Sequence, residues 1–576
     1  MVYSATYSTI NYMTHTFYTI YLKALYGDKS ASHIQARLQT LMEQYRGRIQ
    51  KPADPSLTER DSLLITYGDQ VQDVGGSHLQ TLDDFCEAHL RGVVSGIHIL
   101  PFYPWSSDDG FSVKDYRAVD PALGSWKDIE NLGQSFRLMF DGVINHYSAQ
   151  GEWFQKFLHD EKPYRDYFFT VDGDPDISKV VRPRTLPLLT DYKTEFGLRR
   201  VWTTFSADQV DLDFRNPDVL REIFDILLMY AERGAQFIRL DAIAYLWKEI
   251  GTSCIHLPRT HAVIQLLRAV LDDVAPHVRL ITETNVPHAD NISYFGNGKN
   301  EAQLVYNFAL PPLVLHTFRT EDVSILSRWA SDLELPSEHT TFFNFLASHD
   351  GVGLNPARGI LSSAEIDALV NQTLAHGGLI SYKQNTDGTQ SPYEMNINYF
   401  DALSDPFGDE PIETQVNRFI AAQAIMLSLI GLPGIYFHSL FGSRNWREGV
   451  RITNHNRTIN RQKLVRTELE EQLNDQTSLR SQVFARFSNL LLARSSSAAF
   501  HPHGSQKVLD AGNGIFALSR ISPDGTKNVL CLQNITQQAQ RIENLINKTA
   551  RDLLTNRLQN SKIILRPYQT MWLEIS

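Results

Sequence analysis

The chain has 576 residues, of which 42% are hydrophobic, 11% aromatic and 21% charged, an ordinary composition for a folded globular protein. Its net charge is -11, and no basic stripe offsets the acidic excess, which argues against a nucleic-acid partner. Three widely spaced cysteines, Cys86, Cys254 and Cys531, suit a reducing compartment and provide neither a disulfide framework nor a C-x-x-C metal site.

The sequence also argues against secretion and membrane insertion. The N-terminus lacks the ordered basic, apolar and small-residue regions of a signal peptide. The longest apolar run, residues 421–437, is interrupted by Gly431-Leu432-Pro433-Gly434 and is too short to cross a bilayer. We therefore expect a soluble, cytoplasmic protein with no membrane-spanning segment.

Helical spacing over residues 20–50, followed by a linker with Pro52 and Pro55, predicts an N-terminal helical extension over residues 1–60. Eight strand-like segments follow, and most of them precede an amphipathic helical pattern. These segments are residues 63–69, 96–102, 138–146, 235–241, 278–284, 304–308, 340–350 and 434–437. Eight strand–helix units predict an α/β protein with a (β/α)8 barrel over residues 61–500.

Two intervals within this barrel are longer than a crossover helix requires. Residues 148–217 follow the third strand and residues 351–411 follow the seventh, so we expect an inserted subdomain at each place. Beyond about residue 500 the pattern changes to short alternating segments separated by turns. This change predicts an antiparallel β domain over residues 501–576.

Polar residues recur where the predicted barrel strands end. Asp69, His146, Asp241, Glu283 and the pair His349-Asp350 each follow or close such a segment. Each has an ordinary structural explanation, such as a helix cap or a core histidine. Because the carboxyl ends of parallel barrel strands meet at one rim, their recurrence indicates a functional site there.

The strand before Asp241 carries Arg239, which period-two alternation places on the same face. A cation beside a carboxylate keeps it ionised, as a nucleophile requires, although a buried pair that only ties the barrel together fits equally well. Glu283 follows an apolar strand, and burial there would raise its pKa and suit a general acid. Two such carboxylates are what cleavage of a glycosidic bond requires. Side chains suited to hold a sugar ring are Tyr116, Phe205, His146 and His349.

Several segments in the same order resemble the α-amylase type of glycoside hydrolase, and more narrowly its sucrose phosphorylase subfamily. The resemblance covers residues 63–461. Its motifs include Ile65-Thr66-Tyr67-Gly68-Asp69, Gly96-Ile97-His98-Ile99-Leu100-Pro101-Phe102 and Ser348-His349-Asp350-Gly351-Val352-Gly353, together with the blocks 141–146, 201–213, 238–245, 248–254 and 306–316.

The resemblance implies a retaining enzyme in which Asp241 is the nucleophile and Glu283 the acid/base. Asp350 is implied to be the third carboxylate, which binds sugar hydroxyls. Asp69 and Arg461 resemble the pair that clamps the far hydroxyls of one glucose unit. The other implied substrate-binding residues are His146, Arg239 and His349 as glucose contacts, Phe205 and Tyr116 as stacking walls, and Gln209 in the block 201–213.

The subfamily transfers glucose to inorganic phosphate and releases α-glucose 1-phosphate. Arg184 and Tyr393 resemble the arginine and the tyrosine of its two acceptor loops. Asn145 resembles a calcium ligand of amylases, but the subfamily does without that metal, so we expect neither a metal ion nor a cofactor.

Three departures bear on the substrate. About sixty residues precede the first barrel strand, a tyrosine (Tyr116) stands where the best-known sucrose phosphorylases have a histidine, and residues 381–388 differ from theirs. With segments 283–288 and 290–295, the chain resembles the glucosylglycerate phosphorylases of the subfamily more closely. Arg184 and Lys383 would then serve a carboxylate-bearing acceptor, although a solvated loop lysine explains Lys383 as well.

The expected partners are therefore a small-molecule α-glucoside, most specifically 2-O-α-glucosylglycerate, and inorganic phosphate. A homodimer is compatible with the sequence. The alternatives are a phosphorylase of sucrose, sucrose 6'-phosphate or glucosylglycerol, an α-glucosidase or transglucosidase, and a non-catalytic carbohydrate-binding barrel. The presence of both Asp241 and Glu283 argues against the non-catalytic alternative.

Overall fold

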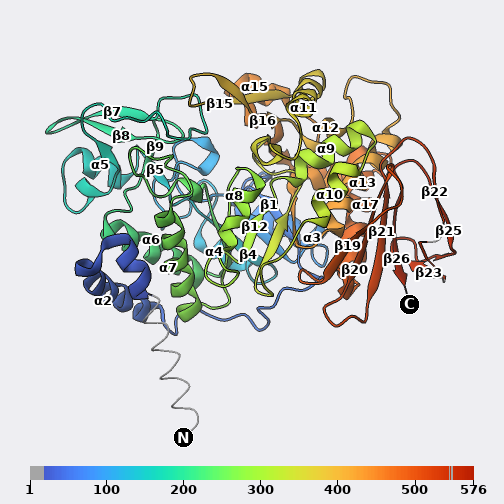
Figure 1. Cartoon of the computed structure of the whole chain (residues 1–576), viewed down its shortest axis with the longest axis horizontal. Coiled ribbons are helices and arrows are strands. Elements are labelled where there is room, and N and C mark those ends of the chain that lie inside the picture. Colours follow the sequence, from blue (N-terminus) through green and yellow to red (C-terminus); the bar gives the residue numbers. More distant parts are fainter. Residues whose placement is uncertain (1–17, 544, 547–548, 576) are drawn as a thin grey trace, which may run out of the picture.

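The computed structural model describes residues 18–543, 545–546 and 549–575. The first seventeen residues of the predicted N-terminal extension lie outside the described residues, as does the last residue of the predicted C-terminal domain. Figure 1 shows an elongated molecule with a central barrel, the N-terminal helices at one end and a β-sheet at the other. Among the described residues, no helix has both the length and the apolar character needed to cross a membrane.

The centre of the molecule is a closed parallel barrel with the strand order β1-β17-β13-β12-β11-β10-β4-β3. Each of the eight predicted strand segments overlaps one barrel strand, and the predicted (β/α)8 fold is confirmed. The strands are β1 (Leu63–Thr66), β3 (Gly96–Ile99), β4 (Arg137–Gly142), β10 (Ala235–Leu240), β11 (Arg279–Thr282), β12 (Leu304–Tyr306), β13 (Thr341–Asn344) and β17 (Leu432–Tyr436).

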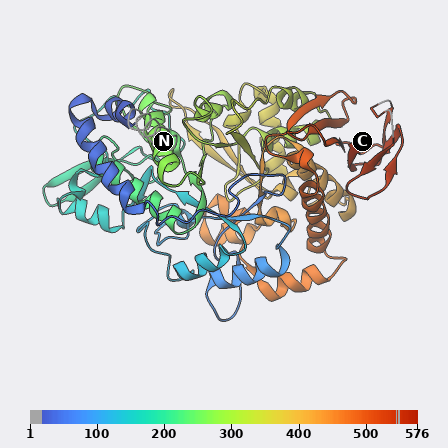
Figure 2. The ribbon, with the colours of Figure 1, turned by 90° about the horizontal axis from the view of Figure 1, so that it is seen from below.

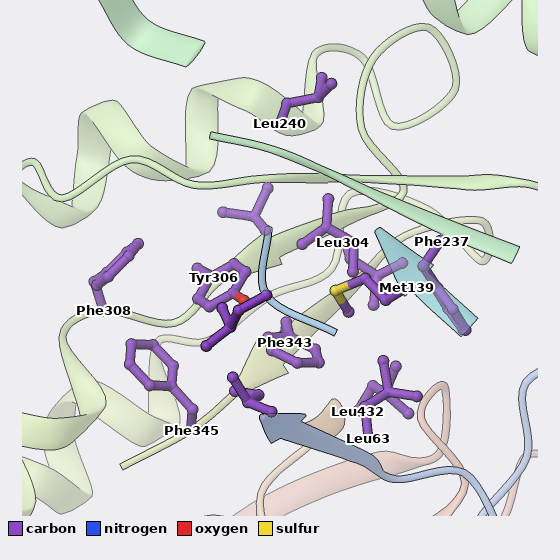
Figure 3. Close-up of a cluster of buried hydrophobic side chains, with 14 of the residues drawn as sticks. Leu63, Met139, Phe237, Leu240, Leu304, Tyr306, Phe308, Phe343, Phe345 and Leu432 are labelled. Atoms are coloured by element: carbon purple, nitrogen blue, oxygen red, sulfur yellow. The ribbon is translucent and has the colours of Figure 1, made fainter. Parts of the chain in front are cut away.

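The interior of the barrel is filled by apolar side chains rather than open. Parallel barrel strands are covered on both faces, which explains their nearly continuous apolar sequences. A buried cluster contains side chains from six strands, namely Leu63, Met139, Phe237, Leu304, Phe343 and Leu432 (Figure 3). Because this apolar cluster fills the barrel, the functional site must lie outside it, at one end of the strands.

Helices surround the barrel and connect its strands. The main ones are α3 (His78–His89), α4 (Trp126–Leu132), α6 (Pro217–Glu232), α7 (Pro258–Val274), α8 (His288–Ile292), α9 (Leu310–Thr320), α10 (Ser324–Ser331), α13 (Ile412–Ser428), α14 (Phe437–Leu440), α15 (Arg447–Thr453), α16 (Arg466–Asn474) and α17 (Leu479–Ser495). Helix α6 starts where the sequence indicates a start, because the Asn216 side chain accepts a hydrogen bond from the Asp218 amide and Pro217 occupies the first turn.

The N-terminal helix α2 (Asp28–Tyr45) packs against α6 and α7 on the outside of the barrel (Figures 1 and 2). Its buried face includes Leu38 and Leu41. The Tyr45 hydroxyl donates a hydrogen bond of 2.6 Å to Asp225 of α6, and Arg46 pairs with Asp273 of α7 at 3.1 Å. This extension lies against the barrel wall, away from the strand ends that carry the polar residues.

Two insertions project on one side of the barrel, the upper side in Figure 1. The first follows β4 and contains β5 (His146–Ser148), α5 (Glu152–Leu158), β6 (Thr170–Val171), β7 (Leu189–Thr194), β8 (Gly197–Trp202) and β9 (Gln209–Asp211). The second follows β13 and contains β14 (Val352–Gly353), α11 (Ser363–Ala375), β15 (Leu379–Gln384), β16 (Gln390–Asn396) and α12 (Tyr399–Leu403). Both therefore stand beside the same end of the barrel.

The C-terminal part of the chain is an antiparallel sheet with the order β19-β20-β21-β26-β23-β24, accompanied by the pair β22-β25. The strands are β19 (Ser505–Leu509), β20 (Ile515–Ile521), β21 (Asn528–Asn534), β22 (Gln540–Glu543), β23 (Ala550–Asp552), β24 (Leu558–Gln559), β25 (Lys562–Leu565) and β26 (Thr570–Ile575). Figures 1 and 2 place this sheet at the opposite end of the molecule from α2. The residue boundaries given above for the domains remain predictions.

Candidate active site

A pocket with about 610 Å³ of empty space, which includes open solvent, lies where the barrel strands end. Its lining comes from the strand ends and from both insertions. The lining residues are Asp108, Phe111, His146, Arg184, Phe205, Gln209, Asp241, Ala242, Ala244, Tyr245, Glu283, Thr284, Asn285, Val286, His349, Asp350, Tyr393 and Arg457. The three predicted catalytic carboxylates thus share one pocket.

The backbone brings Asp241 and Glu283 to the same rim. Strand β10 ends at Leu240 and strand β11 at Thr282, so each carboxylate is the first residue beyond its strand. Ala242 adopts a left-handed conformation with φ of 48°, which costs a non-glycine residue roughly 1–2 kcal/mol. In that conformation its amide donates a hydrogen bond of 2.9 Å to Oε2 of Glu283. One peptide unit therefore links the two carboxylates.

Asp241 is held by a chain of buried charges. Nη1 of Arg239 donates to Oδ1 of Asp241 at 2.9 Å and also contacts Asp141 on the neighbouring strand β4. Nε2 of His98 lies 2.7 Å from Asp141. Arg239 therefore both steadies the carboxylate and ties adjacent strands together, so the two explanations left open by the sequence hold at once.

The same environment sets the protonation of the pair. Burial raises the pKa of Asp241, and the positive charge of Arg239 opposes that rise. Burial raises the pKa of Glu283 to about 7, with Arg239 opposing the shift and the carboxylates of Asp241 and Asp350 adding to it. A carboxyl group with that pKa exchanges its proton near neutral pH, which suits a general acid and base. The raised pKa agrees with the prediction from the apolar strand.

The pKa of Asp350 is shifted in the opposite direction from that of Glu283. Burial alone would raise its pKa, but the guanidinium groups of Arg457 and Arg461, followed by that of Arg239, bring the pKa below its ordinary value. Arg457 makes an ion pair with Asp350, and Nη2 of Arg461 lies 3.7 Å from it. The pocket thus contains one carboxylate that stays ionised beside another that carries a proton near neutral pH.

The predicted pairing of Asp69 with Arg461 is wrong. Asp69 lies outside the pocket lining, 2.6 Å from Lys463, because β1 ends at Thr66 and the chain then turns toward β2 (Val71–Gln72). Arg461 instead pairs with Asp109 at 2.6 Å. Asp109 belongs to the loop after β3, in the sequence Asp108-Asp109-Gly110-Phe111, and this local cluster of two aspartates and a glycine was the signal available in the sequence.

Tyr116 is not a wall of the pocket, which corrects a second prediction. Its side chain is buried, and its hydroxyl donates to the backbone carbonyls of Val143 and His146 at 2.9 Å each. Tyr116 therefore supports the segment that carries His146 from beneath. Phe111, from the same loop, lines the pocket and stacks on His349 with ring centroids 4.7 Å apart.

The other predicted glucose contacts lie together around the pocket. His146, Gln209, Phe205 and His349 all line it. Nε2 of His146 lies 2.8 Å from the Phe111 carbonyl oxygen and 3.3 Å from the Gln209 side-chain amide. Arg239 and Arg461 are outside this lining, and they pair with the lining carboxylates Asp241 and Asp350 respectively.

The two insertions place Arg184 and Tyr393 opposite the barrel rim. The Arg184 guanidinium lies 5.7 Å from the Phe205 ring centroid and 5.5 Å from that of Tyr393. Among the ion pairs of the described residues, none includes Arg184. A guanidinium that lies close to two aromatic rings and lines a pocket is suited to bind an anion.

Lys383 does not join this group. It lies on β15, outside the pocket lining, and partial burial together with the nearby charge of Arg358 lowers the pKa of Lys383. The predicted role of Lys383 toward an acidic acceptor is therefore not supported by its position. Sequence reasoning also missed Arg457, which lines the pocket four residues before Arg461.

The amylase-like calcium position holds a lysine ammonium group instead. Nζ of Lys248 lies 2.8 Å from Oδ1 of Asn145 and 2.7 Å from Oδ2 of Asp211. Calcium takes six to eight oxygen ligands, and here a protein cation already contacts these two oxygens, so the residues do not fit the metal. Within the described ranges, no group of three or more histidine, cysteine or acidic residues has a geometry that would hold a metal ion.

Comparisons with known proteins agree with this geometry. The model of the α-amylase catalytic domain family matches residues 91–351. A glucosylglycerate phosphorylase of Spirochaeta thermophila is 52% identical over 90% of this chain and 89% of its own length, and one of Escherichia coli K12 is 46% identical over 96% and 99%. The crystal structure of a sucrose 6F-phosphate phosphorylase from Thermoanaerobacter thermosaccharolyticum has a TM-score of 0.74 at 26% identity, covering 89% of this chain and all of that one.

The barrel and its paired rim carboxylates define an enzyme of the α-amylase type. Within that class, the chain belongs to the glycoside phosphorylases, in the family of the glucosylglycerate phosphorylases.

Proposed function

We propose that the protein transfers glucose from 2-O-α-glucosylglycerate to inorganic phosphate and releases glycerate and α-glucose 1-phosphate. The observation that carries the phosphorylase assignment is Arg184. Its guanidinium has no carboxylate partner in the described chain and faces the pocket that holds Asp241 and Glu283. Phosphate and the carboxylate of glycerate are both anions, whereas water and neutral sugars have no need of this cation.

In the first step, a carboxylate oxygen of Asp241 attacks the anomeric carbon of the glucose unit. The bond to the glycerate oxygen breaks, and that oxygen takes the proton of Glu283. A β-glucosyl ester on Asp241 results, and glycerate leaves as a neutral alcohol at that oxygen. The Glu283 pKa of about 7 makes this proton available at neutral pH.

In the second step, an oxygen of hydrogen phosphate attacks the same carbon and Asp241 departs as a free carboxylate. The proton that the phosphate carries returns to Glu283, which restores the enzyme. Two inversions at the anomeric carbon give the α product. Arg184 would hold the glycerate carboxylate in the first step and the phosphate in the second, so the two anions would exclude each other.

The test compares four donors, each with and without phosphate. The protein is incubated with glucosylglycerate, sucrose, sucrose 6'-phosphate or glucosylglycerol, and both glucose 1-phosphate and free glucose are measured. We expect phosphate-dependent glucose 1-phosphate, with the highest kcat/KM on glucosylglycerate. Free glucose at the same rate without phosphate would reject the phosphorylase, and a higher kcat/KM on a neutral donor would reject the glycerate assignment.

We also propose that this reaction takes place in the cytoplasm. The three thiols Cys86, Cys254 and Cys531 are all buried and free, which fits a reducing compartment. Fractionation of cells into cytoplasmic and exported protein tests this proposal, and recovery of the enzyme among exported proteins would contradict it.

A further inference from the structure

A further acidic residue, Glu394, lies beside the pocket. Glu394 is only 1% exposed, and it follows Tyr393 on strand β16 of the second insertion. Burying a carboxylate so completely is costly unless charged partners and hydrogen bonds compensate for it. Its partners therefore indicate what it does.

Both oxygens of Glu394 hold the same arginine. Nε of Arg457 donates to Oε1 at 3.0 Å and Nη2 to Oε2 at 2.7 Å, a bidentate arrangement that fixes the plane of the guanidinium. Oε1 also accepts a hydrogen bond of 3.1 Å from the amide of Gly351, the residue directly after Asp350. The remaining Nη1 of Arg457 makes the ion pair with Asp350.

Packing at Gly351 is tight enough to transmit this contact. A Cβ atom at that position would lie 2.5 Å from the Met395 carbonyl oxygen and 2.6 Å from Cγ of Glu394, so only glycine fits against β16. The strand thus presses on the backbone that carries Asp350. Tyr393, which directly precedes Glu394 on β16, lines the pocket and lies close to Arg184.

We propose that Glu394 is a positioning residue for Asp350, acting through Arg457 and Gly351. By this link, β16 couples the acceptor side, where Tyr393 stands, to the carboxylate that binds glucose hydroxyls. The inference rests on glucosyl transfer in this pocket, as proposed above, but not on which acceptor is used.

A physical reason supports the need for Glu394. Arg457 faces two carboxylates: it donates two hydrogen bonds to Glu394 and makes an ion pair with Asp350. Without the Glu394 charge, the guanidinium would be free to turn entirely to Asp350 and to occupy the oxygens that bind the sugar. Misplacement of a reacting or binding group by about 1 Å can cost about 10²-fold in rate.

The test uses α-glucosyl fluoride, whose departure needs no proton and whose turnover with water needs no phosphate. For Glu394→Gln we expect kcat on this donor to fall about 10- to 100-fold, while KM for phosphate in the full reaction changes less than about threefold. Glu394→Asp keeps the charge on a shorter arm, so we expect a smaller loss of about three- to tenfold. A smaller loss in Glu394→Asp than in Glu394→Gln distinguishes a role of the charge from general packing.

Asp401 offers a matched control in the same insertion. It is also 1% exposed and pairs with an arginine, Arg444, at 2.8 Å, but it does not contact Asp350 or line the pocket. Asp401→Asn should lower the melting temperature and leave kcat unchanged. Wild-type kcat in Glu394→Asp and Glu394→Gln, or equal losses in Glu394→Gln and Asp401→Asn, would overturn the proposal.

Because α-glucosyl fluoride reports on glucosyl transfer alone, this experiment separates the two proposals. Suppose that the Glu394 variants show the expected losses on α-glucosyl fluoride, but that all natural donors are turned over without phosphate. That result would reject the phosphorylase and leave the role of Glu394 intact. If Glu394→Gln does not fold, the kcat of Glu394→Asp alone decides, because an unchanged value contradicts positioning.

Discussion

Asp241 and Arg184 line the same pocket, but their charges are compensated in different ways. Asp241 pairs with Arg239, two residues earlier in the chain and 2.9 Å away, and Arg239 also contacts Asp141. Arg184 comes from the first insertion and rests on two aromatic rings, one of them supplied by the second insertion. In the proposed mechanism, the side that binds glucose therefore has its charges paired within the barrel, whereas Arg184 on the acceptor side is available to bind either the glycerate carboxylate or phosphate.

This comparison makes the glucose side the more sensitive to substitution. Asp241→Ala removes the attacking oxygen, for which no other group in the pocket has the same position, so we expect turnover to fall on the order of 10⁴-fold or more. Release of glucose 1-phosphate from glucosylglycerate measures the effect, with the melting temperature as the control for folding. Substantial residual turnover by a folded variant would show that Asp241 is not the nucleophile.

Glu283→Gln should cost about 10²- to 10⁴-fold on glucosylglycerate, because the departing oxygen needs a proton, and much less on α-glucosyl fluoride. With a pKa of about 7, Glu283 loses its proton as the pH rises, so the glucosylglycerate rate should fall above about pH 7. The fluoride rate should not follow that decline. Parallel pH profiles for the two donors would argue against an acid role.

Substitutions on the acceptor side should change KM for phosphate rather than the rate of the first chemical step. For Arg184→Met we expect KM for phosphate to rise about 10- to 100-fold, the range for losing a hydrogen bond to a charged group. Turnover of α-glucosyl fluoride with water should change little. Lys383→Met is the matched control, because Lys383 lies outside the pocket and should leave both parameters near the wild-type values. The reverse ranking of these two variants would contradict the assignment of Arg184.

The smallest effect in this series concerns the proposed contacts of Arg461 with the far hydroxyls of glucose. Asp109→Asn removes the ion pair with Arg461, and we expect about a tenfold loss in kcat/KM for every glucosyl donor. Asp69→Asn alters a partly exposed pair with Lys463 and should cost less than about threefold. Steady-state kinetics on glucosylglycerate and α-glucosyl fluoride compare the two variants. A larger loss from Asp69→Asn would restore the pairing that the sequence suggested.

The same contrast explains what the sequence could and could not predict. The eight strands and the rim position of Asp241 and Glu283 follow from local patterns, because a strand and the residue after it are contiguous. Asp69 obeys the same pattern but misleads, since the chain turns away three residues after β1 ends. Strand-end position alone does not say which way the next loop goes.

The sequence did not predict which residues far apart in the chain pair with each other. Glu394 and Arg457 are separated by 63 residues and meet only because the second insertion folds back onto the segment before Arg461. Tyr116 looked like a binding aromatic but points under the pocket, where its hydroxyl satisfies two backbone carbonyls. Such orientations depend on tertiary packing rather than on residue type.

Capture of the covalent intermediate tests the central claim most directly. The Glu283→Gln variant is given α-glucosyl fluoride without phosphate, and its peptides are mapped by mass spectrometry. We predict one added glucosyl unit on the peptide that contains Asp241, released as α-glucose 1-phosphate when phosphate is supplied. A glucosyl unit on another residue, or β-glucose 1-phosphate as the product, would contradict the account.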